Sequence, residues 1–94
     1  MDDLTNDQIL ARAGRAKQLL EDELFKEAIL VTEERIIEAW KVASSSEVRE
    51  SLHYQLHGLT SVVQAIRGVL DDGDFLKDQL EKKERTGKMT ERML

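Results

Sequence analysis

A regular stripe of six large apolar residues constrains the fold of this chain more than any other sequence feature. Its members follow one another at steps of four, three, four, three and four residues: Leu52, Leu56, Leu59, Val63, Ile66 and Leu70. Apolar residues at this spacing lie on one side of an α-helix and form the seam of a helical hairpin or bundle. We therefore predict a long helix over about residues 47–71 that packs lengthwise against another helix.

A first helix is predicted near the N-terminus. Thr5 and Gln8 have the spacing of a capping box, in which each side chain bonds the other residue's backbone amide. The apolar residues that follow recur with helical periodicity. This pattern predicts a helix over about residues 6–20.

A second helix is predicted between two polar breaks. Asp22 is a favourable helix N-cap, and a dense apolar stretch follows it, so we expect a helix over about residues 23–43. Three consecutive serines then separate this helix from the third one. Ser44 or Ser46 is expected to cap the third helix.

The third helix is expected to end at Asp72-Gly73-Asp74, where Gly73 can adopt the left-handed conformation that follows a last helical turn. These elements predict an all-α fold: a long antiparallel helical hairpin with an N-terminal helix packed on it. One helical domain would span residues 1–72, and residues 73–94 would form a short charged C-terminal helix or flexible tail.

Length and charge indicate which partners the chain is suited to. A chain of 94 residues without cysteine has a marginal core and no disulfide to support it, so self-association is expected. Residues 1–72 carry a net charge of −6, which argues against direct nucleic-acid binding. No apolar run is long enough to span a membrane and no signal peptide is evident, so we expect a cytoplasmic protein without a membrane partner.

One group of residues has metal-ligand spacing. His53 and His57 are four residues apart and Glu50 lies three residues before His53, so all three share one side of the predicted helix. A metal-binding helical bundle is therefore one alternative function. The other interpretation is a solvated polar face, because these residues lie across the helix from the leucine stripe.

Other chemistry is not supported by the sequence. No serine lies in a nucleophile-elbow motif, and the glycines are isolated rather than grouped in a phosphate-binding loop. We therefore predict that the protein is not an enzyme, has no catalytic residues and needs no cofactor.

Three residues of the second helix are the predicted interface. Leu30 and Ile37 are seven residues apart on an otherwise charged side of the helix, where large apolar residues often meet a partner. Trp40 is the one large aromatic anchor, and tryptophan is frequent at the centre of interfaces. We expect these residues to form a contact in a homo-oligomer.

The acidic charge supports a second alternative, an inhibitor that mimics DNA and occupies a nucleic-acid-binding host protein. Its binding face would include Glu23, Glu27 and Glu34 on the second helix. The partner would then be a foreign protein rather than a second copy of the chain.

Three segments resemble small helical proteins of tailed bacteriophages and prophages: Arg15-Ala16-Lys17-Gln18-Leu19-Leu20-Glu21-Asp22-Glu23-Leu24-Phe25-Lys26-Glu27-Ala28, then Ala39-Trp40, then Arg49-Glu50-Ser51-Leu52. The resemblance covers about residues 12–72, and Glu23 stands where those proteins often have proline. It implies a phage-encoded accessory of virion assembly or DNA packaging. Such a protein would lie in the host cytoplasm or the virion and would contact other phage or host proteins.

Overall fold

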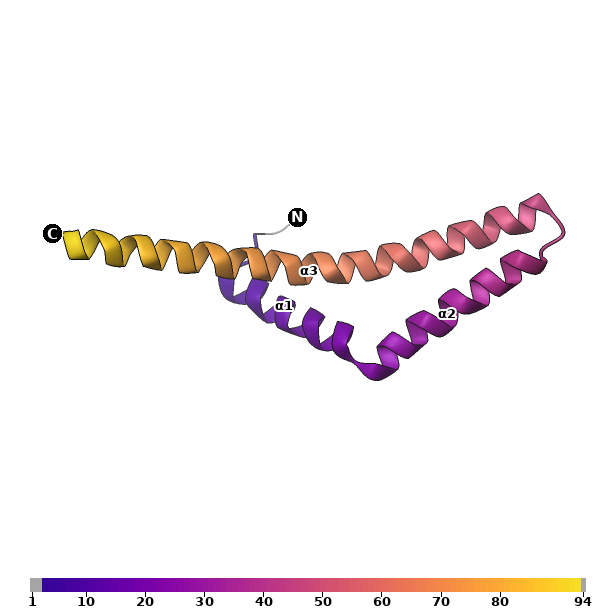
Figure 1. The fold of residues 1–94 in the computed structure, drawn as a ribbon, viewed down its shortest axis with the longest axis horizontal. Helices are drawn as coiled ribbons and strands as arrows, with labels where there is room; N and C mark the ends of the chain where they lie inside the picture. Colours follow the sequence, from indigo (N-terminus) through magenta and orange to yellow (C-terminus); the bar gives the residue numbers. More distant parts are fainter. Residues whose placement is uncertain (1–2, 94) are drawn as a thin grey trace.

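The described part of the chain consists of three α-helices arranged as an open triangle (Figure 1). The computed structural model describes the backbone of residues 3–93 and the side chains of residues 3–86. The helices are α1 (Asn6–Glu21), α2 (Glu23–Val42) and α3 (Ser46–Met93), and this region contains no strand. The prediction of an all-α fold is confirmed. Within the same region, no helix combines the length and the apolar content that crossing a bilayer requires.

The start of α1 agrees with its prediction. The amide of Gln8 donates to Thr5 Oγ1 at 3.2 Å, and the amide of Thr5 donates to Gln8 Oε1 at 2.9 Å. This reciprocal pair satisfies two amides that a helix start otherwise leaves without a partner. The capping box therefore fixes where the helix begins.

A single residue, Asp22, joins α1 to α2. Its amide donates to the carbonyl of Leu19 at 3.2 Å, and its carboxylate accepts from the amide of Phe25 at 2.8 Å. Its backbone is extended, with φ −66° and ψ 126°, so the chain changes direction there. Asp22 thus ends one helix and caps the next, as its position in the sequence predicted.

The turn between α2 and α3 is capped by a different serine from those predicted. Ser45, rather than Ser44 or Ser46, accepts from the amide of Val48 through its Oγ at 3.2 Å. The prediction of a break at the three serines is correct, and the expected cap was wrong by one residue. Spacing alone does not distinguish neighbouring serines, because each of them has the hydroxyl that a cap requires.

The expected end of α3 near residue 71 is wrong. The helix continues through Asp72, Gly73 and Asp74 to Met93, and no described residue has a positive φ. Gly73 is buried where α1 crosses α3. Its hydrogen side chain allows close approach of the two backbones, which is a use of glycine unrelated to ending a helix.

Alanine and glycine side chains form the crossing of α1 over α3. Ala13 and Ala16 are buried there. A Cβ built on Gly73 would overlap the Cβ of Ala13 and lie 3.6 Å from its Cα. The two helices therefore meet at a distance that no larger side chain at residue 73 would permit.

The expected lengthwise packing of the hairpin is not confirmed. After the turn, α2 runs back beneath α3 but diverges from it, and α1 returns to α3 from the far end of α2 (Figure 1). Ile36 is the one buried residue of α2. The radius of gyration is 20.5 Å, whereas a compact domain of this length has about 12 Å. Because the helices enclose little volume, much apolar surface stays in contact with solvent.

Candidate interaction surface

The chain exposes far more surface than a compact protein of its size. Its accessible area is 7926 Å², whereas a folded monomer of this mass exposes about 5,500 Å². The buried apolar residues are Ala13, Ala16 and Ile36. Twelve large apolar residues are exposed: Leu4, Leu19, Leu24, Leu30, Ile37, Trp40, Val42, Val48, Tyr54, Val62, Phe75 and Leu80.

The three predicted interface residues are all on the surface of α2. The exposed fractions are 58% for Leu30, 38% for Ile37 and 47% for Trp40. Helix α1 joins α2 at the opposite end from Trp40 and turns away toward α3 (Figure 1). These side chains are therefore available for a contact, and the assignment of that contact stays a prediction.

Trp40 also has a partner within the chain. The guanidinium carbon of Arg49 lies 5.2 Å from the centre of the indole ring, and Arg49 Nε donates to the carbonyl of Ala43 at 3.2 Å. A guanidinium at this distance over an aromatic face is a cation–π contact. Arg49 thus connects α3 to the end of α2 and to the turn between them.

The candidate metal ligands do not form a metal site. Glu50, His53 and His57 are exposed on α3. Glu50 Oε1 accepts from the hydroxyl of Tyr54 at 3.3 Å. Among the residues that the structure describes, no three histidine, aspartate or glutamate side chains converge as metal ligands would. The geometry therefore gives the metal-binding alternative no support.

The acidic face of α2 lies on the surface. Glu23, Glu27 and Glu34 are all exposed, and Lys26 pairs with Glu23 at a distance of 3.7 Å. A pair this exposed adds little to stability. The face is therefore accessible to a basic partner, as the DNA-mimic alternative requires.

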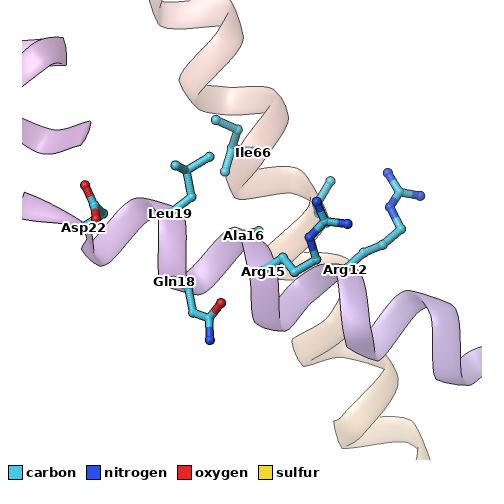
Figure 2. A pocket seen from close by; sticks show the side chains of 8 residues that line it. Arg12, Arg15, Ala16, Gln18, Leu19, Asp22 and Ile66 are labelled. Carbon is cyan, nitrogen blue, oxygen red and sulfur yellow. The ribbon is translucent and has the colours of Figure 1, made fainter. Parts of the chain in front are cut away.

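A groove lies between α1 and α3 on one side of their crossing. It has a volume of about 580 Å³ and is lined by Arg12, Arg15, Ala16, Gln18, Leu19, Asp22, Ile66 and Val69. Leu19 and Ile66 face each other across it, and Arg12 and Arg15 lie together toward its other end (Figure 2). The groove thus has an apolar part and a basic end.

The sequence interpretation missed a second regular face of α3, which we call the valine flank. It consists of seven residues at alternating steps of three and four: Val48, Ser51, Gln55, Gly58, Val62, Ala65 and Val69. The first six are exposed, and 51% of Val48 and 56% of Val62 are accessible. Residues 51–66 contain no aspartate, glutamate, lysine or arginine, although 35% of the chain is charged. This run without charge was the sequence signal that could have identified the flank.

Comparison with known proteins adds no relative to this description: no protein-family model, no curated protein and no solved structure matches the chain.

Proposed function

We propose that this protein is a non-enzymatic, self-associating helical interaction protein. The observation that supports the proposal is the accessible area, which exceeds that of a compact monomer by about 2,400 Å². A standard stable interface buries about 800 Å² on each partner. The chain therefore has ample surface for such a contact.

The small size of the core points in the same direction. Apolar burial is the main favourable contribution to folding, and here it involves two alanines and one isoleucine. A second copy would remove further apolar surface from water and so stabilise the fold by mass action. An accessory role in virion assembly or DNA packaging belongs to the same proposal and rests on the sequence resemblance over residues 12–72.

The test is the molar mass in solution, measured by light scattering on a sizing column over a series of concentrations. We expect a defined mass of two or more chains at micromolar concentration. The mass should fall toward that of one chain on dilution if assembly is reversible. A single-chain mass at every concentration up to the high micromolar range would refute the proposal.

A further inference from the structure

We infer that the valine flank of α3 is a self-association face, on which a second copy of the chain packs its own valine flank in the antiparallel direction. The inference rests on the proposed function and names the surface and the geometry of the contact. It assigns the contact to a different side of the molecule from Leu30 and Ile37.

The first step is the pattern of the flank itself. Alternating steps of three and four residues place its members in one line along α3, as in the seam of two packed helices. No other helix of the chain covers this line between Val48 and Ala65, since these residues are exposed. A helix surface in water is normally charged opposite its core. The missing charge over residues 51–66 therefore indicates a covered face.

The second step is the shape of the flank. Gly58 lies at its middle, and a Cβ built there would meet nothing within 4 Å. Ser51 and Ala65 lie one heptad before and after it. Small side chains at the centre of a seam let two helices approach closely, as Gly73 and Ala13 do at the crossing within the chain.

The third step is the charge at the two ends of the flank. Its N-terminal end adjoins a hollow lined by Glu47 and Glu50. At its C-terminal end, Val69 lines the groove that also contains Arg12 and Arg15. Within the described part of the chain, neither arginine has an ion-pair partner.

These charges select the direction of packing. In an antiparallel pair with its twofold axis next to Gly58, Val48 of one copy lies opposite Val69 of the other. The acidic end of each flank then meets the basic end of its partner, twice by symmetry. A parallel pair would instead place Glu47 beside a second Glu47, which is unfavourable. Complementary charge therefore favours the antiparallel arrangement.

The test of the face compares two variants of one helix. Val62→Glu places a carboxylate in the flank, whereas Gln64→Glu places one two residues away on the other side of α3, where the side chain is also exposed. We expect Val62→Glu to raise the dissociation constant by more than about tenfold, because its carboxylate would be buried without a partner. Gln64→Glu should leave it unchanged. Circular dichroism of both variants should show wild-type helix content, since glutamate favours helix more than valine does.

The direction is tested by disulfide formation, for which the chain offers a background without cysteine. Val48→Cys and Val69→Cys variants should cross-link to each other when mixed under oxidising conditions, and neither should cross-link alone. A cross-link within Val48→Cys alone and none in the mixture would indicate a parallel pair and overturn the inference.

The outcomes separate this inference from the proposed function. If the wild type is an oligomer and Val62→Glu has the same mass and affinity, the face is wrong and the proposed function stands. If the wild type is a monomer at every concentration, both are refuted. An oligomeric wild type that Val62→Glu dissociates, with Gln64→Glu unaffected, supports both.

Discussion

Replacing Gly73 by alanine should separate α1 from α3. The added Cβ would overlap the Cβ of Ala13, while the Ala13 Cα at 3.6 Å and the carbonyl oxygen of Ile9 at 3.8 Å lie behind it. Ordinary contact between two carbons requires about 3.5–4.0 Å. Ala13 has no rotatable side-chain bond, so a rotamer change cannot provide the space. The backbone of α1 must therefore move away from α3.

The size of the effect follows from two opposing terms. Forcing an additional carbon into a packed contact costs about 1–3 kcal/mol. Alanine in place of glycine in a helix contributes about 1 kcal/mol of stabilisation. Gly68→Ala is the matched control, because it lies in the same helix and its Cβ would meet nothing within 4 Å. The helix term is common to both variants, so we expect Gly73→Ala to be less stable than Gly68→Ala by about 1–3 kcal/mol.

The assay is urea unfolding followed by circular dichroism, with all proteins at one chain concentration because self-association changes apparent stability. Hydrogen exchange provides a second measurement: amides of α1 should exchange faster in Gly73→Ala, and those of the turn at residues 43–45 should not. A Gly73→Ala protein as stable as Gly68→Ala, with unchanged exchange in α1, would refute the reasoning from the close crossing.

Three further changes test other contacts. Asp22→Ala removes the cap of α2 and should lower the free energy of unfolding by about 1 kcal/mol in urea, whereas Asp22→Asn should retain most of it. Arg49→Ala uncovers Trp40 and removes the bond to the turn, so stability should fall by about 1–2 kcal/mol and the tryptophan emission should shift to longer wavelength; unchanged emission would contradict the stacking. The double variant Leu30→Glu with Ile37→Glu tests the interface predicted from sequence: the mass in solution should fall at fixed concentration, and an unchanged mass would exclude that contact.

Local structure was the part of the fold that the sequence predicted well. The starts of α1 and α2 follow from Thr5 and Asp22, because a cap depends on side chains within three residues of the amide that they bind. The periodicity of the leucine stripe likewise gave the helical state of α3 over residues 47–71. These features involve near neighbours in the chain, so they need no knowledge of tertiary structure.

Features that depend on distant residues were not predictable in the same way. Gly73 fits both a helix end and a helix crossing, and the presence of Ala13, 60 residues earlier, decides between them. The divergence of α2 from α3 depends on the direction of the chain at Asp22, which a cap motif does not specify. Among the candidate site residues, exposure of Leu30 and Ile37 followed from the helical wheel, whereas the valine flank was hidden by attention to the stronger leucine stripe beside it.

The triangle of helices has a mechanical consequence. Its corners are the joint at Asp22, the turn at residues 43–45 and the crossing at Gly73 (Figure 1). At 1.5 Å per residue, α2 is about 30 Å long, the part of α3 between its two corners about 41 Å, and the part of α1 between its corners about 13 Å. A frame of three rigid bars has fixed angles even if every corner is a free hinge. The numbers of residues in the helices, rather than the stiffness of the joints, therefore set the opening between α2 and α3, and one added helical turn in α2 would widen it.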